Sequence, residues 1–272
     1  MTKLDISAAW TSATRMVSAN RDMLMAIAGV FFLLPGLAVA VFMGDPDIAS
    51  NVDPKQAMTI LAETYLSAAP LLIFVSLLQL TGTLIVLIVM IDPSRPTVAE
   101  AIKRGFVATP PYFGAQVLVY VVGGFTMLAL ASLLAATGVA VLAAAALVAL
   151  FVAMVWVLLR VSLVAPVLAS SETRNPVTAI KRSWSLTTGN SPYLLAFYGL
   201  SALLFFVVYG LIMMFAGVVL ALTTSGSVQT VLAAVVSSAL FSAWLVYFAA
   251  MTAAVHRQLS GPPSGETREV FE

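Results

Sequence analysis

Residues 193–222 read YLLAFYGLSALLFFVVYGLIMMFAGVVLAL and contain no charged side chain. An α-helix needs about 20 apolar residues to cross the hydrocarbon layer of a bilayer. This stretch therefore predicts a transmembrane helix, and comparable apolar runs recur along the chain. The full set is Met23–Met43, Tyr65–Ile91, Tyr112–Ala135, Gly138–Ala169, Tyr193–Leu222 and Val228–Val255.

The composition points to the same class of protein. Hydrophobic residues make up 61% of the 272 residues, charged residues only 9%, and the mean hydropathy is +1.04. A soluble domain carries roughly 25% charged residues, so this inventory cannot build a water-facing surface. We predict an all-α, polytopic protein with six transmembrane helices, in which a single membrane domain spans residues 1–260 and a disordered cytoplasmic tail spans residues 261–272.

The third and fourth apolar runs are nearly continuous and meet at Ala136, Thr137 and Gly138. Together they cover about 58 residues, close to three span lengths, so we predict a tight reversal between two helices. In the alternative, a five-helix chain, the C-terminus would lie on the opposite side of the membrane.

The basic residues predict the orientation, because lysine and arginine are enriched in cytoplasmic loops. With a cytoplasmic N-terminus, Lys55 is the only basic residue outside, and the other 12 of the 13 lie inside. Both termini are therefore expected in the cytoplasm. The inside set is Lys3, Arg15, Arg21, Arg95, Lys103, Arg104, Arg160, Arg174, Lys181, Arg182, Arg257 and Arg268.

The largest outside segment, Gly44–Thr64, is acidic. We predict a solvated loop with one short helix, and the alternative is a cation site whose geometry nothing in the sequence fixes. The acidic residues are Asp45, Asp47, Asp53 and Glu63.

A short internal repeat divides the chain. Residues 101–106 read AIKRGF and residues 179–184 read AIKRSW, and each copy precedes an expected proline-containing turn and two spans. Residues 6–17 form a weaker third copy. We predict three units, about 1–91, 95–169 and 174–255, each an amphipathic interfacial helix followed by a pair of transmembrane helices.

Local signals place these interfacial helices. Asn175 is the expected N-cap of the last one, with Pro176 at the first helical position, while Thr97 and Glu100 form an expected capping box. Basic faces of such helices attract anionic headgroups. The candidate lipid or anion contacts are Lys103, Arg104, Arg174, Lys181, Arg182, Trp184 and Arg160. In the alternative, these cations only enforce topology.

Arg160 is the one charged residue well inside an apolar run. An intramembrane ionisable residue is a candidate functional site, but a long arginine can also reach the interface as an anchor. Both roles stay open. Its partner would be a backbone carbonyl, a lipid phosphate or a loop residue such as Glu172.

Catalytic chemistry is not predicted. The chain has no cysteine and a single histidine, His256, and no Ser/His/Asp arrangement, phosphate-binding loop or metalloprotease motif is visible. We therefore expect neither enzyme activity nor a metal or other cofactor. A net charge of +1 gives no reason to expect a nucleic-acid partner.

Residues 160–190 resemble the membrane domain that is attached to some bacterial glycerophosphoryl diester phosphodiesterases. They also resemble the related stand-alone YciC-like inner-membrane proteins. The resemblance is carried by Arg160, Pro166, Glu172, Ala179, the Arg182-Ser183-Trp184 group and the Leu186–Gly189 turn. It implies a membrane module in the bacterial inner membrane, without the soluble catalytic barrel of that phosphodiesterase.

The leading functional hypothesis is a non-catalytic protein of membrane, lipid or envelope homeostasis that binds anionic phospholipid or a partner at its cytoplasmic face. One alternative is a transporter with a site between the repeats near Arg160. Another is an accessory subunit for a soluble glycerophosphodiesterase. A protein partner and homo-oligomerisation both stay open.

Overall fold

A computed structural model describes residues 3–43, 52–136, 139–170 and 173–261. Every regular element among these residues is helical, and six helices are long and apolar enough to cross a membrane. This confirms the predicted all-α class and the predicted number of long apolar helices. The predicted tail at residues 261–272 lies, apart from Gly261, outside the described residues.

The chain begins with α1 (Ile6–Ala19), whose first turn is capped by the Asp5 carboxylate accepting the Ala8 N–H. A longer rod follows, built from α2 (Arg21–Ala28), the π-helical turn η1 (Gly29–Leu33) and α3 (Leu34–Met43). The π-turn ends two residues before Pro35, which has no N–H to donate, and the Leu34 N–H donates to the Gly29 carbonyl. The rod is the first candidate span.

Next come α4 (Pro54–Ser67), α5 (Ala69–Ile91) and α6 (Val98–Ala135). Two glycines allow close packing around α5. A Cβ added at Gly82 would lie 2.5 Å from the Phe31 Cβ, and one added at Gly105 of α6 would lie 2.4 Å from the Ile85 Cγ1. These close approaches hold η1 and α6 against neighbouring turns of α5.

The second half of the chain contains α7 (Ala140–Val161), the short α8 (Val164–Ala169), α9 (Pro176–Thr187), α10 (Ser191–Thr223) and α11 (Gly226–Ser260). The helices α6 and α7 are separate and in contact, as the predicted reversal requires. Thr137 and Gly138 of that reversal lie outside the described residues.

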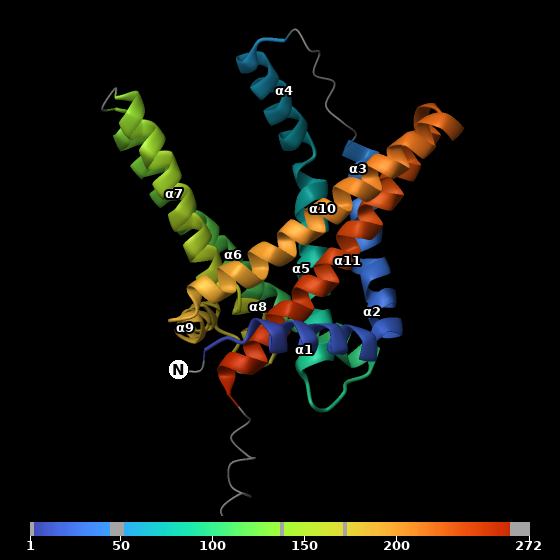
Figure 1. The fold of residues 1–272 in the computed structure, drawn as a ribbon, viewed down its shortest axis with the longest axis vertical. Coiled ribbons are helices and arrows are strands. Elements are labelled where there is room, and N and C mark those ends of the chain that lie inside the picture. Colours follow the sequence, from blue (N-terminus) through green and yellow to red (C-terminus); the bar gives the residue numbers. More distant parts are fainter. Residues whose placement is uncertain (1–2, 44–51, 137–138, 171–172, 262–272) are drawn as a thin grey trace, which may run out of the picture.

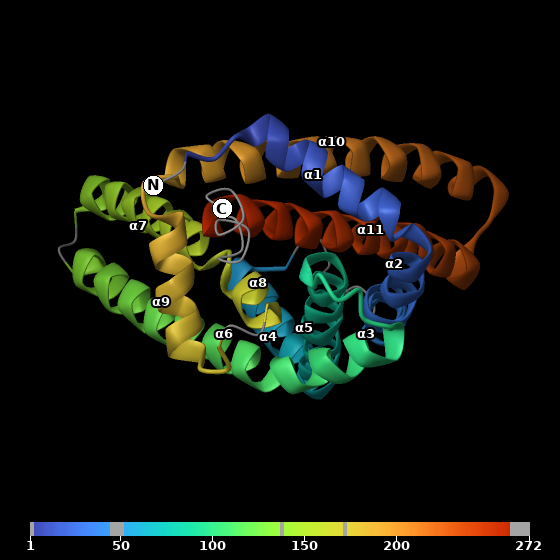
Figure 2. The ribbon, with the colours of Figure 1, turned by 90° about the horizontal axis from the view of Figure 1, so that it is seen from below.

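The helices converge at one end of the bundle and diverge toward the other (Figure 1). We call the converging end basal; it carries α1, α9 and the α5–α6 loop at residues 92–97. Seen from below, α1 lies across α11, and α9 bridges α7 and α6 (Figure 2). The Leu4 N–H donates to the Asn190 Oδ1 at 2.9 Å, and the Asp5 N–H donates to the Gln258 Oε1 at 3.2 Å. Both ends of the described chain therefore lie at the basal end.

The buried core also lies toward the basal end. It includes residues 84–90 of α5, all six residues of α8 and residues 249–256 of α11. The diverging ends of α6, α7, α10 and α11 instead expose large apolar side chains such as Phe125, Phe151, Phe215 and Leu222. Exposed apolar side chains on long helices are what lipid contact requires.

One local prediction is wrong. The first repeat copy, residues 101–106, is not a separate helix followed by a proline-containing turn; it is the beginning of α6, which continues through Pro110 and Pro111. Interior prolines remove helical hydrogen bonds, but two adjacent prolines need not end a helix that is packed on both sides of them. Here Gly105 and Thr109 fix the preceding turn against α5, and Ala115 is buried beyond it.

The acidic segment is described only in part. Asp45 and Asp47 lie outside the described residues, while Asp53 precedes α4 and Glu63 lies within it. The predicted short helix is therefore present. In the part of the chain that the structure describes, no group of three or more His, Cys, Asp or Glu side chains could hold a metal ion.

Candidate functional site: a basic pocket at the basal end

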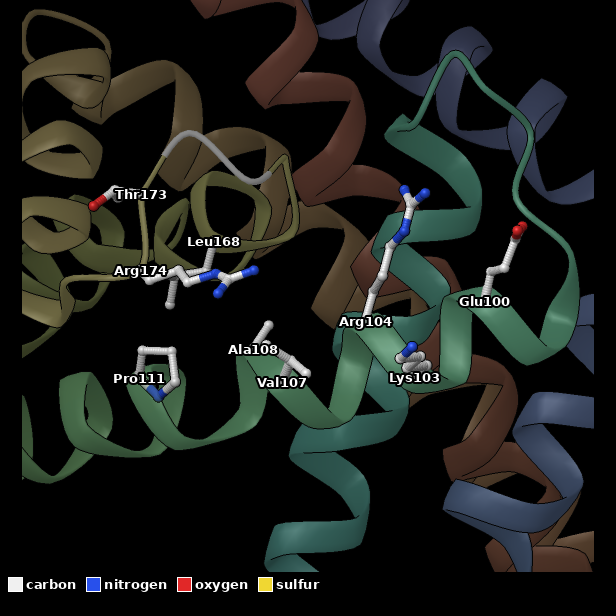
Figure 3. Close-up of a pocket in the computed structure, with 9 residues that line it drawn as sticks. All are labelled: Glu100, Lys103, Arg104, Val107, Ala108, Pro111, Leu168, Thr173 and Arg174. Atoms are coloured by element: carbon white, nitrogen blue, oxygen red, sulfur yellow. The ribbon is translucent and has the colours of Figure 1, made fainter.

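A pocket of about 310 Å³ opens between the first turns of α6 and the link from α8 to α9 (Figure 3). Three of the predicted contacts, Lys103, Arg104 and Arg174, line it together. The sequence placed these residues in different repeat units, so their proximity is a product of the fold. The rest of the lining is Glu100, Val107, Ala108, Pro111, Leu168 and Thr173.

The start of α6 positions the first two cations. The Thr97 N–H donates to Glu100 Oε2 at 2.9 Å, and the Glu100 N–H donates to Thr97 Oγ1 at 3.3 Å. This reciprocal pair is the predicted capping box, which is confirmed. The Glu100 carboxylate is therefore hydrogen-bonded to the backbone at the start of α6, about one turn before Lys103 and Arg104.

Arg104 already has an acidic partner. Its Nη1 forms an ion pair with the Asp92 Oδ2, and the Asp92 Oδ1 accepts the Ser94 N–H at 2.8 Å. Hydrogen bonding from Ser94, followed by the charge of Arg104, lowers the pKa of the Asp92 carboxyl below its usual value. The sequence prediction treated Arg104 as a free lipid contact and did not foresee this pair.

Lys103 and Arg174 form no ion pair with any described residue. Both side chains are exposed, and Figure 3 shows the Arg174 guanidinium extending over Leu168 and Ala108 toward α6. Arg174 directly precedes Asn175, whose Oδ1 accepts the N–H groups of Val177 and Thr178. The predicted N-cap of α9 is thus confirmed, and it fixes the backbone next to Arg174.

A second cluster surrounds Arg160 at the end of α7. Its Nη1 donates to the Thr188 Oγ1 at 2.9 Å, and its guanidinium carbon lies 5.0 Å from the Trp156 ring centroid and 5.6 Å from that of Trp184. The two indole rings lie nearly perpendicular, with centroids 5.0 Å apart. These are attractive cation–π distances. Glu172, the suggested acidic partner, lies outside the described residues.

Ser183 bridges the break between α7 and α8. Its hydroxyl donates to the Arg160 carbonyl at 2.7 Å and accepts the Leu163 N–H at 3.2 Å. Both backbone groups lose their helical partners where the helix is interrupted at residues 162–163, and a buried unpaired group is costly. In the sequence, Ser183 is distinguished only as part of the Arg182-Ser183-Trp184 group. Its position one residue before Trp184 gave no sign that it reaches another helix.

The remaining predicted contacts lie elsewhere. Lys181 and Arg182 are exposed on α9 and do not line the pocket, while Trp184 belongs to the Arg160 cluster. The predicted set thus divides into a pocket group, an Arg160 group and an outer face of α9. Only the pocket group combines several cations with a cavity.

Comparison with protein-family models, with curated proteins and with solved structures finds no match to this chain. The six long apolar helices alone place it in the class of multi-pass α-helical membrane proteins.

Proposed function

We propose that this chain is a non-catalytic multi-pass protein of the bacterial inner membrane that binds the headgroup of an anionic phospholipid at its cytoplasmic face. The observation that carries the proposal is the pocket that Lys103, Arg104 and Arg174 line together with apolar residues. Cations bind phosphate oxygens through charge-assisted hydrogen bonds. Aliphatic walls favour a ligand that also has hydrocarbon.

The surroundings of the pocket support a lipid in particular. Leu168 and Ala108 form an apolar floor, and Val107 lies partly exposed beside it. Farther along α6, Phe113 and Val117 are also exposed. An anionic headgroup held by the cations would therefore lie next to an apolar helix surface on which acyl chains can pack.

The distribution of charge supports a cytoplasmic basal end. Among the described residues, Lys55 lies in the first turn of α4 at the opposite end, and the other basic residues lie on elements of the basal end. This asymmetry fits the positive-inside pattern, with both termini in the cytoplasm.

The three-unit organisation belongs to the same proposal. In the two strong copies, three positions with the same spacing are buried, and the threonine of each copy donates to the carbonyl four residues earlier at 2.9 Å. The basic pairs that follow the first of these positions stay exposed. The buried positions are Ala101, Gly105 and Thr109 in one copy and Ala179, Ser183 and Thr187 in the other. The shared pattern supports a repeated unit in which this segment precedes or begins a pair of long helices: α9 comes before α10 and α11, and residues 101–109 begin α6 ahead of α7.

Arg160 fits an anchoring role better than a transport site. Thr188 and two tryptophan rings already engage its guanidinium, and both rings are partly exposed. Tryptophan is enriched where the bilayer meets water. An arginine packed beside two interfacial tryptophans stabilises the end of α7 without needing a substrate.

Replacing Lys103 and Arg174 with glutamine is expected to reduce the anionic phospholipid that co-purifies with the protein in mild detergent at least fivefold, because two phosphate contacts are lost. The measurement is mass spectrometry of the retained lipid. Lys181→Gln combined with Arg182→Gln removes the same charge from the outer face of α9 and serves as the matched control. A loss of lipid that is equal in the two variants would contradict the proposed pocket. No loss in either variant would contradict it as well.

The absence of cysteine allows a direct test of orientation. We expect a cysteine introduced at Lys55 to react with a membrane-impermeant maleimide in intact cells, and a cysteine introduced at Ser7 to react only after the membrane is opened. Both positions are exposed in the structure. Labelling of Ser7→Cys in intact cells would reverse the proposed topology.

A further inference from the structure

The basic pocket holds more positive charge than its acidic residues balance. Asp92 neutralises Arg104, and the Glu100 carboxylate accepts the Thr97 N–H at the outer edge of the pocket, on the far side of Lys103 from Arg174. Lys103 and Arg174 have no ion-pair partner among the described residues. Among the described residues, Lys103 and Arg174 therefore line the cavity without an ion-pair partner, and the five charged side chains at the pocket, Asp92 and Glu100 included, sum to +1.

These two cations belong to different elements. Lys103 projects from α6, whereas Arg174 projects from the α8–α9 link on the other side of the cavity. An arginine fork can contact two oxygens of one phosphate, and a lysine supplies a compact charge to a third. A phosphate with three free oxygens has enough acceptors for both groups, while a phosphodiester has only two free oxygens.

The remaining lining favours a small headgroup. Apart from the charged residues, only Thr173 contributes a hydroxyl, and the other lining residues are Val107, Ala108, Pro111 and Leu168. Headgroup hydroxyls of glycerol or inositol type would find few hydrogen-bond partners on these walls, and unmade hydrogen bonds weaken binding. A bare phosphate avoids that loss.

We infer that the pocket selects a phosphomonoester lipid of the phosphatidic acid type over phosphodiester lipids. The inference rests on the proposed function, which requires only that some anionic phospholipid binds. A phosphomonoester carries between one and two negative charges near neutral pH, because its second pKa is about 6, whereas a phosphodiester carries one. The additional negative charge strengthens the attraction to Lys103 and Arg174, which have no ion-pair partner among the described residues.

The test uses the full-length protein in nanodiscs of phosphatidylcholine to which either phosphatidic acid or phosphatidylglycerol is added, with bound lipid measured by native mass spectrometry. We expect about tenfold tighter binding of phosphatidic acid, the effect of roughly one additional close charge contact. Lys103→Gln should remove most of this preference. Lys181→Gln, at the equivalent position of the other repeat copy, should leave it unchanged.

The outcomes separate the two levels of the proposal. Equal binding of both anionic lipids, lost in Lys103→Gln, would overturn the phosphomonoester preference and leave anionic lipid binding in place. Equal binding of phosphatidylcholine and both anionic lipids would overturn the proposed function as well. Soluble glycerol 3-phosphate that competes as strongly as phosphatidic acid would overturn the lipid assignment.

Asp92→Asn provides an independent arm. Asparagine keeps an oxygen that can accept the Ser94 N–H but removes the charge paired with Arg104. Arg104 then becomes available to the ligand, so phosphatidic acid should bind roughly two- to fivefold more tightly, the scale of a released surface ion pair. Weaker binding in this variant would overturn the charge accounting on which the inference depends.

Discussion

Gly82→Val is expected to lower the free energy of unfolding by about 3 kcal/mol, at the upper end of the usual cost of overpacking a core. Gly82 is the point at which η1 of the first span packs against α5. A Cβ at this position would lie 2.5 Å from the Phe31 Cβ and 2.8 Å from the Phe32 Cε1. The Phe31 Cβ is fixed directly to the backbone, so a rotamer change cannot relieve the contact.

Gly210→Val in α10 is the matched control for this effect. No atom outside its own helix turn lies within 4 Å of a Cβ added at Gly210, and valine has a higher helix propensity than glycine. The control should keep or slightly raise the melting temperature of the detergent-solubilised protein, measured by its intrinsic fluorescence. Equal destabilisation by both substitutions would show that Gly82 is not a close-packing point.

The spans and the helix caps could be predicted because their signals are local. A run of apolar residues such as residues 193–222 identifies a candidate span regardless of what lies next to it. The capping pair Thr97 and Glu100 and the N-cap Asn175 act within four residues of themselves. Each of these features depends on neighbouring residues in the sequence, and each is present in the structure.

The pocket could be predicted only as a list of cations. Lys103 and Arg174 are far apart in the sequence, and their convergence depends on how α8 packs beside α6. The Asp92 and Arg104 pair likewise depends on the path of the α5–α6 loop. Helical periodicity gives the face of a helix on which a charge lies, but it does not identify the residue of another element that lies opposite.

The continuation of α6 through Pro110 and Pro111 shows that packing can also override a local sequence signal. Proline is a strong local signal for a turn, yet packing of Gly105 and Thr109 against α5 holds the helix together before these prolines. In the other repeat copy the chain does leave the helix, at Gly189, whose φ is +80°. Local propensity gave the right answer in one copy and was overridden by packing in the other.

Ser183→Ala is expected to lower the free energy of unfolding by about 2 kcal/mol, although it removes a single oxygen atom. Ser183 is fully buried, and its hydroxyl contacts both the Arg160 carbonyl and the Leu163 N–H across the break between α7 and α8. Alanine fits the space but leaves the buried N–H without a partner, which costs about 1 to 3 kcal/mol. The Arg160 carbonyl would keep only the longer 3.4 Å contact from Thr187.

Ser185→Ala on the same helix is the control, because Ser185 is exposed and its loss changes no contact between helices. A decrease in melting temperature for Ser183→Ala alone would show that the hydroxyl, rather than the helix propensity of α9, joins α9 to the break. The same region positions Arg160, because its carbonyl accepts the Ser183 hydroxyl and its guanidinium lies beside the rings of Trp156 and Trp184. If Ser183→Ala were as stable as Ser185→Ala, the break would need another source of hydrogen bonds, such as water, and Ser183 would lose its assigned role in joining α7, α8 and α9.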